Sequence, residues 1–187
     1  MKKRLISIII PAHNEAKIIH YILQRLITLV NPGDIYVVDD GSTDATAEIV
    51  ETHGCRLLRL QSNVGKAMAL NTGIKQFQLY SRYRYIFPLD ADTTMTRTFI
   101  PEIIRCFSQN PKKPHAVVGR VCGTSKNWLT LYRMWEYEIG QSIHKRAQSS
   151  IGAISVCSGC STVYKSDVLQ NMTFPGVDIS WIWRWQF

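Results

Sequence analysis

The chain lacks an apolar run long enough to cross a membrane. No stretch of about 18 consecutive apolar residues occurs, and Leu5–Ile10, which follows Lys2-Lys3-Arg4, is too short for a membrane span or a signal peptide. We therefore expect a cytoplasmic location, either free or at the inner face of the cell membrane.

Cysteine is too sparse and too dispersed to form a disulfide framework. Five cysteines, an odd number, suit a reducing compartment. Cys157 and Cys160 form a Cys-x-x-Cys pair, but no second pair exists to complete a zinc site. We interpret this pair as part of a structural loop rather than as a zinc or redox centre.

Glycine-rich phosphate loops are also missing. No strand end carries Gly-x-Gly-x-x-Gly, which disfavours a dinucleotide-dependent oxidoreductase. The first loop, Pro11–Glu15, has no glycine, which disfavours a nucleotidyltransferase that cradles a triphosphate. The formal net charge of +8 favours anionic partners, but no nucleic-acid-binding module accompanies it, so nucleic acid is not expected.

What the chain does contain is an alternation of short aliphatic runs and amphipathic segments. With 187 residues, 45% of them hydrophobic, it fits one globular domain. The alternation predicts an α/β fold with a doubly wound, mostly parallel sheet. Strands are expected at 5–10, 35–38, 56–60, 85–89 and 116–118, and helices at 17–30, after Ser42, and at 65–77, 99–107 and 128–143.

Polar residues follow four of these strands directly. In open α/β sheets, ligands bind beyond the carboxyl ends of the strands, so these residues are the first candidates for function. They are Ala12–Glu15, Asp39–Asp44, Ser62–Lys66 and Asp90–Thr93.

Asp90-Ala91-Asp92 has the character of a divalent-metal site. Alternate side chains after a strand point the same way, so Asp90 and Asp92 can converge while Ala91 leaves room for a ligand. Mg²⁺ and Mn²⁺ prefer hard oxygen ligands, commonly one or two carboxylates together with phosphate oxygens. The alternative is a solvated turn, which is the usual interpretation of an isolated Asp-x-Asp.

Two other strand ends add to this picture. Asp39–Asp44 predicts a turn with Ser42 or Thr43 as the helix N-cap, leaving Asp40 free to accept hydrogen bonds from a uracil ring or a ribose. Asn63–Lys66 opens the next helix, where backbone N–H groups and the Lys66 ammonium could meet a phosphate. An ordinary surface lysine is the alternative.

The segment 128–143 carries an aromatic stripe at helical spacing. We expect it to pack on the core or on parts of the protein outside this chain, rather than on a ligand. The stripe consists of Trp128, Tyr132, Trp135, Ile139 and Ile143.

Taken together, these motifs resemble the processive family 2 glycosyltransferases, which include hyaluronan, chitin-oligosaccharide and cellulose synthases. The resemblance covers about residues 5–170, with His13 standing where tyrosine is usual. It rests on Pro11–Glu15, Val37–Asp44, Asn63–Ala67 followed by Asn71, Leu89–Thr93, Trp135–Gln141 and Cys157–Tyr164.

The resemblance implies a GT-A fold, a three-layer α/β/α sandwich. It implies one domain over residues 1–187, with a donor-binding half at 1–120 and a partial acceptor-side half at 121–187. The implied activity is inverting transfer from a UDP-sugar to a glycan, a lipid-linked acceptor or another hydroxyl, with Mg²⁺ or Mn²⁺ as cofactor. The implied donor-binding residues are Pro11, Ala12, Asn14, Glu15, Asp39, Asp40, Lys66, Asp90 and Ala91, and the implied metal ligands are Asp92 and Asp90.

The end of the chain departs from the family pattern. The family's Thr-Glu-Asp base motif is absent, and Asp178 is the nearest candidate for the base. In the family's Gln-x-x-Arg-Trp motif, Trp181 replaces the glutamine if Arg184-Trp185 forms its end. We interpret the chain as truncated at its C-terminus, and a non-catalytic remnant that binds a nucleotide sugar is the alternative to an active enzyme.

Overall fold

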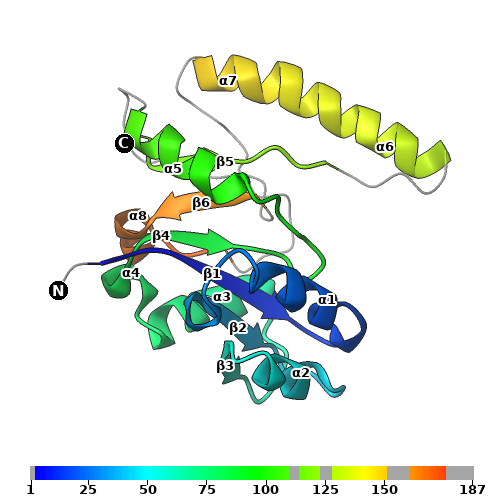
Figure 1. Ribbon diagram of the computed structural model, residues 1–187, viewed down its shortest axis with the longest axis vertical. Helices are drawn as coiled ribbons and strands as arrows, with labels where there is room; N and C mark the ends of the chain where they lie inside the picture. Colours follow the sequence, from blue (N-terminus) through cyan, green and yellow to red (C-terminus); the bar gives the residue numbers. More distant parts are fainter. Residues whose placement is uncertain (1–2, 110–113, 123–127, 151–160, 176–187) are drawn as a thin grey trace.

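The computed structural model describes residues 3–109, 114–122, 128–150 and 161–175. Six strands form one sheet in the order β3-β2-β1-β4-β6-β5 (Figure 1). The strands are β1 (Arg4–Ala12), β2 (Ile35–Asp39), β3 (Arg56–Arg59), β4 (Tyr83–Pro88), β5 (Ala116–Val118) and β6 (Thr162–Lys165). The helices are α1 (Ala16–Leu26), η1 (Pro32–Asp34), α2 (Thr46–Thr52), α3 (Lys66–Gln76), α4 (Leu79–Arg82), α5 (Phe99–Gln109), α6 (Trp128–Ile139), η2 (Gly140–Lys145), α7 (Arg146–Ser150) and α8 (Ser166–Asn171).

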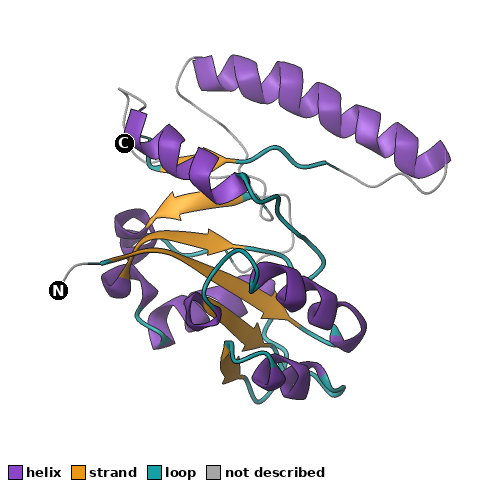
Figure 2. Cartoon of the chain, viewed as in Figure 1, coloured by secondary structure: helices purple, strands orange, loops and turns teal. Residues whose placement is uncertain are grey.

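The sheet lies between two layers of helices, as expected for a three-layer α/β/α sandwich (Figure 2). Successive side chains of β1 point to opposite faces, because side chains alternate along a strand. Ile8 and Ile10 pack with α1, α2 and α5 on one face, whereas Ile9 packs with α3 on the other. All three isoleucines are fully buried, which explains why β1 is apolar throughout rather than alternating.

Five strands run in the same direction, and β6 runs against them. β1 pairs in parallel with β2 and β4, and β2 pairs in parallel with β3. β6 runs antiparallel to both β4 and β5. The prediction of a mostly parallel sheet is confirmed, although the sequence did not reveal β6.

Gly73 lets α3 approach the sheet closely. A Cβ at this position would lie 2.4 Å from Val38 Cγ2 and 2.9 Å from Ile9 Cδ1, which are closer than atoms can pack. α3 can therefore lie directly on β1 and β2, and its first residue, Lys66, is held beside the carboxyl ends of these strands.

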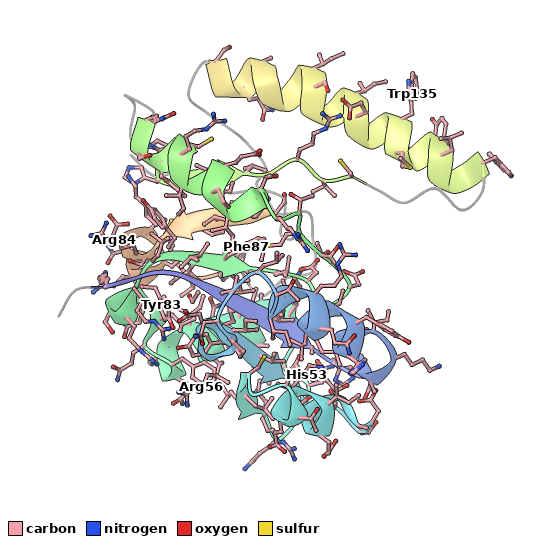
Figure 3. The ribbon with its side chains drawn as sticks, viewed as in Figure 1. His53, Arg56, Tyr83, Arg84, Phe87 and Trp135 are labelled. Carbon is pink, nitrogen blue, oxygen red and sulfur yellow. The ribbon has the colours of Figure 1, made fainter. Side chains whose placement is uncertain are left out.

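A hydrogen-bond network fixes the opposite, amino end of the sheet. The buried Tyr83 hydroxyl donates to Asp34 Oδ1 at 2.5 Å and lies 3.0 Å from the Tyr36 hydroxyl. Arg4 forms an ion pair with Asp34 at 2.8 Å. Burial, followed by the hydrogen bond to Asp34, raises the pKa of Tyr83, so this tyrosine (Figure 3) stays a neutral donor. The network joins β1, β2 and β4 through their side chains.

The predicted helix 128–143 forms as α6 and then widens into the π-helical turn η2. Its aromatic stripe does not pack on the described core: Trp128 is 79% exposed and Trp135 is 61% exposed. Trp135 projects from α6 into solvent (Figure 3), and α6 lies beyond α5 at the edge of the molecule (Figure 1). Packing on the core is therefore not observed, and packing on parts of the protein outside this chain stays a prediction. No described helix is long and apolar enough to span a bilayer.

Candidate functional site

Four loops converge at the carboxyl end of the parallel strands. They follow β1, β2, β3 and β4, as predicted from the topology. Together they enclose a cavity of about 300 Å³. Its lining consists of Pro11, Ala12, His13, Glu15, Asp40, Asn63, Gly65, Lys66, Asp90, Ala91 and Asp92.

Hydrogen bonds join the first two of these loops. The Asn14 backbone N–H donates to Ser42 Oγ at 2.9 Å, and the Thr43 N–H donates to Asn14 Oδ1 at 2.9 Å. The Glu15 N–H donates to Thr46 Oγ1 at 2.9 Å. Asn14 has a positive φ of 56°, a conformation that asparagine tolerates better than most residues. Asn14 therefore braces the site without lining the cavity.

Asp39 also has a supporting role. Its Oδ1 accepts the Ser42 N–H at 3.0 Å, closing the turn that contains Gly41. Gly41 has a φ of 68°, and a Cβ there would lie 2.7 Å from the Ser62 carbonyl carbon. This turn therefore requires glycine, and through it the loop after β2 reaches the loop after β3.

Asp40 is buried and already engaged. Its Oδ1 accepts the Val64 N–H at 2.8 Å and its Oδ2 accepts the Gly65 N–H at 2.9 Å. Only 3% of the residue is exposed. Both carboxylate oxygens therefore orient the turn that precedes α3. Each oxygen can still accept a second hydrogen bond, so a contact with a base or a ribose stays a prediction.

The helix after this loop starts later than predicted. α2 begins at Thr46, and its N-cap position is Ala45 rather than Ser42 or Thr43. Asp44 supplies the missing contacts, since it accepts from the Thr46 hydroxyl, from the Thr46 N–H at 3.0 Å and from the Ala16 N–H at 3.1 Å. Burial alone would raise the pKa of Asp44, but these hydrogen bonds together hold it below the usual value.

Lys66 and the two aspartates after β4 face one another across the cavity. Lys66 Nζ forms an ion pair with Asp90 Oδ1 at 2.5 Å, and both side chains are partly exposed. β4 ends at Pro88, and the Thr93 N–H donates to the Asp90 carbonyl at 3.0 Å, closing a turn. Asp90 and Asp92 thus line the same cavity, as predicted, but through a turn rather than through strand alternation.

His13 is a lining residue that was not predicted as a donor contact. Its Nδ1 lies 2.7 Å from the Asp40 carbonyl oxygen, which can only accept, so Nδ1 carries a proton. Asn14 Oδ1 accepts from Thr43, which leaves Asn14 Nδ2 to donate to His13 Nε2 at 3.1 Å. These two contacts fix the ring as a wall of the cavity. Asn63 and Gly65 were also missed, although the Asn63–Lys66 motif pointed to their loop.

Eight of the predicted site residues line the cavity, whereas Asn14 and Asp39 stand behind it. Asp178, the candidate base, and the Cys157/Cys160 pair lie outside the described residues. The eight are Pro11, Ala12, Glu15, Asp40, Lys66, Asp90, Ala91 and Asp92.

The donor set fits Mg²⁺ or Mn²⁺ only as part of a larger complex. Asp90 and Asp92 offer carboxylate oxygens, the ligands that these ions prefer. Within the described residues, no group of three His, Cys, Asp or Glu side chains could hold an ion alone. Water and the phosphate oxygens of a ligand could complete the coordination, which suits a site for a metal–diphosphate complex.

The amino-acid sequence matches one protein family over most of its length. The family model for "Glycosyl transferase family 2" matches residues 7–173. Among curated relatives, a poly-beta-1,6-N-acetyl-D-glucosamine synthase from Staphylococcus epidermidis is 33% identical over 184 residues, which cover 93% of this chain and 42% of the relative. The chain thus spans less than half the length of this relative.

Solved structures share the fold at lower sequence identity. A mannosyltransferase from Pyrobaculum calidifontis, in complex with GDP-Man and Mn²⁺, has a TM-score of 0.69 at 22% identity, over 94% of this chain and 49% of that one. Glucosyl-3-phosphoglycerate synthase from Mycobacterium tuberculosis, in complex with UDP, has a TM-score of 0.58 at 18% identity. The match covers 88% of this chain and 58% of that one. These similarities confirm the predicted GT-A architecture.

Proposed function

Because the chain belongs to glycosyl transferase family 2, we propose that its cavity binds a UDP-sugar with a divalent metal and transfers the sugar to a hydroxyl acceptor. The observation that carries this proposal is the meeting of Lys66 with Asp90 at 2.5 Å, beside Asp92 and in front of the α3 N-terminus. A cation, a helix N-terminus and two carboxylates are what a metal–diphosphate complex requires.

Each side of the cavity has a distinct role in this proposal. Pro11, Ala12, His13 and Glu15 form the wall expected to meet the nucleoside. With a metal–diphosphate complex bound, the Lys66 ammonium would leave Asp90 and pair with a phosphate oxygen. The Asp90 and Asp92 carboxylates would be free to hold the metal, so the Lys66–Asp90 ion pair would be replaced by a lysine–phosphate pair and a carboxylate–metal pair. When bound, the metal would supply Lewis-acid neutralisation of the charge on the departing diphosphate.

Supporting residues keep this arrangement in place before the donor arrives. Asp40 holds Val64 and Gly65, and so fixes the direction in which α3 presents Lys66. Asp39, Asn14 and Ser42 hold the loop that bears Asp40. Preorganised polar groups stabilise developing charge without a reorganisation cost at the moment of reaction.

Inversion at the anomeric carbon requires a base within hydrogen-bond reach of the acceptor hydroxyl. We assign this role to Asp178. In this proposal, residues 1–120 bind the donor and residues 121–187 supply part of the acceptor side of a single domain. The name of the Staphylococcus relative makes N-acetylglucosamine the first sugar to test and a growing glycan the first acceptor.

A UDP-release assay tests the transfer proposal. Purified protein with Mn²⁺, UDP-N-acetylglucosamine and oligosaccharide acceptors should release UDP, and both Asp92→Asn and Asp178→Asn should reduce the rate by at least about 100-fold. The matched control is Glu102→Gln, because Glu102 is an exposed acid on α5 outside the cavity. UDP binding without any release would contradict transfer and favour the binding-only alternative.

We also propose that the protein works at the inner face of a membrane. Its net charge is +8, and α6 exposes Trp128, Tyr132 and Trp135, the residue types that favour the membrane–water interface. Sedimentation with anionic vesicles should retain the wild type and lose a Trp128→Ser/Trp135→Ser variant. Equal retention of both proteins, or of neither, would contradict attachment through α6.

A further inference from the structure

Two histidines meet where α1 packs against α2. His20 lies on α1, and His53 (Figure 3) is the C-cap residue of α2. Their ring centroids are 4.9 Å apart, with an angle of 72° between the ring planes. Neither histidine lines the cavity at the carboxyl end of the strands. The pair is therefore a separate cluster of metal-binding side chains on the outer face of the molecule.

The hydrogen bonds of His53 determine which of its nitrogens is available to a ligand. Nδ1 lies 2.7 Å from the Ile49 carbonyl oxygen, which can only accept, so Nδ1 carries a proton. The Thr52 hydroxyl donates its own hydrogen to the same carbonyl, and so it can only accept from Nδ1, which is 3.3 Å away. In the neutral ring, the lone pair is then on Nε2. Such support of the second ring nitrogen by a backbone carbonyl is usual for a metal-binding histidine.

His20 is less constrained than His53. Its ring packs edge-on against Tyr21, with centroids 5.6 Å apart. Within the described residues, neither nitrogen of the His20 ring has a hydrogen-bond partner. Both histidines are partly buried, so solvent and small ions can reach them. The His20 ring is therefore free to turn a nitrogen toward a ligand that it shares with His53.

We propose that His20 and His53 together bind Zn²⁺ and so tie α1 to α2. Imidazole nitrogen is a common zinc ligand, and two Zn–N bonds of about 2.0–2.1 Å at a tetrahedral angle place the ring centroids about 5 Å apart. The observed separation is 4.9 Å, so the site requires rotation of the side chains rather than movement of the helices. No group of three His, Cys, Asp or Glu among the described residues could hold an ion, so water completes the coordination.

This zinc site differs from the metal site proposed beside Lys66. Asp90 and Asp92 offer carboxylate oxygens, which suit Mg²⁺ and Mn²⁺, whereas the His20–His53 pair offers imidazole nitrogens, which suit Zn²⁺. The two sites share no residue. The zinc proposal therefore does not depend on the proposed transfer function, and either one can fail without the other.

Zinc titration of single variants tests the site. In competition with a chromogenic chelator at pH 7.5, the wild type should bind one Zn²⁺ that both His20→Ala and His53→Ala weaken at least about 10-fold. The double variant should bind this ion no more weakly than either single variant, because loss of one ligand already breaks the chelate. Accessible thiols, Cys106 and Cys122 among them, are alkylated beforehand because thiolates also bind zinc. The matched control is His115→Ala, which removes an exposed histidine elsewhere and should match the wild type.

Thermal unfolding gives a readout that a simple ring contact would not move. Zn²⁺ at about 100 times its Kd should raise the Tm of the wild type by about 5–10 °C, because the folded chain alone brings the two rings together. His20→Ala and His53→Ala should lose this rise. His115→Ala and Asp92→Ala should keep it, since neither removes a ligand of this ion.

Chemical modification of the wild type needs no variant and so avoids any effect of substitution on folding. Diethyl pyrocarbonate modifies accessible histidines, and mass spectrometry measures the rate at each one. Zn²⁺ should slow the modification of His20 and His53 at least about fivefold, because a metal-bound nitrogen has no free lone pair. The rate at the exposed His115 should not change.

Four outcomes would overturn the proposal. The first is equal Zn²⁺ affinity in the wild type and in both folded single variants, and the second is modification of His20 and His53 at rates that zinc does not change. The third is an additive loss in the double variant, which would indicate two independent histidines instead of one shared ion. The fourth is loss of the ion in Asp92→Ala with retention in His20→Ala, which would place it in the donor cavity.

Discussion

The Gly65 backbone N–H donates to Asp40 Oδ2 at 2.9 Å, which ties the end of β2 to the residue that precedes α3. Gly65 has a positive φ of 86°, and the next residue, Lys66, reaches Asp90. A buried carboxylate just after one strand thus sets where the lysine of a neighbouring helix is presented.

Replacing Asp40 by Asn tests this arrangement. The new amide places a buried NH₂ group against one of two backbone N–H donors, so one hydrogen bond is lost and two donors face each other. We expect the free energy of unfolding to fall by about 1–3 kcal/mol, measured by urea denaturation. Asp92→Asn is the control, because Asp92 is exposed and should change stability by less than about 0.5 kcal/mol. Equal losses in the two variants would refute the structural role of Asp40.

Lys66 and Lys75 form a natural pair for testing charge in the site. Both lie on α3, but only Lys66 lines the cavity, and Lys75 is exposed in the last turn. Charge-assisted hydrogen bonds contribute about 1.5–3 kcal/mol, so Lys66→Ala should weaken UDP binding by roughly 10- to 100-fold. Lys75→Ala should leave the Kd unchanged. Similar weakening by both substitutions would indicate a general effect of net charge instead of a site.

Much of the fold and the position of the site could be predicted from the sequence. β1 and β2 are buried on both faces, and each is therefore a nearly continuous aliphatic run in the sequence. Such a run predicts a strand of a parallel sheet even when its neighbours are unknown. Once such strands are recognised, topology places the residues after them at one edge. This explains why Lys66, Asp90 and Asp92 were found.

What the sequence did not reveal depends on contacts between distant residues. β6 has four residues and is a strand only because β4 and β5 pair with it. The sequence predicts a free carboxylate at Asp40, and only the structure shows that the backbone N–H groups of Val64 and Gly65 donate to it. No local pattern encodes these pairings.

Gly73→Ala tests the close contact between α3 and the sheet. The added methyl group would overlap Val38 and Ile9, so α3 must shift outward. Overpacking of this kind costs about 1–3 kcal/mol, which exceeds the gain in helix propensity. The free energy of unfolding should therefore fall, whereas a more stable variant would show that the contact is loose.

Cys55 should be slow to react with thiol reagents. Burial raises its pKa from the usual 9.0 to about 11, so the thiolate, which is the reactive form, is scarcer in the folded protein at every pH below this value. Cys106 and Cys122 are exposed and serve as internal references. Mass spectrometry after alkylation at pH 8 should find Cys55 modified later than Cys106 and Cys122. Labelling of Cys55 at the same rate as these two residues would contradict its burial.

The most direct test of the central claim is a calorimetric titration of UDP with and without Mn²⁺, on the wild type, on Asp92→Ala and on the exposed-acid control Glu102→Ala. The account predicts binding that Mn²⁺ strengthens at least about 10-fold in the wild type and in Glu102→Ala, a gain that Asp92→Ala loses. Wild-type binding that is absent, or that is the same with and without Mn²⁺, would contradict a metal-dependent nucleotide-sugar site.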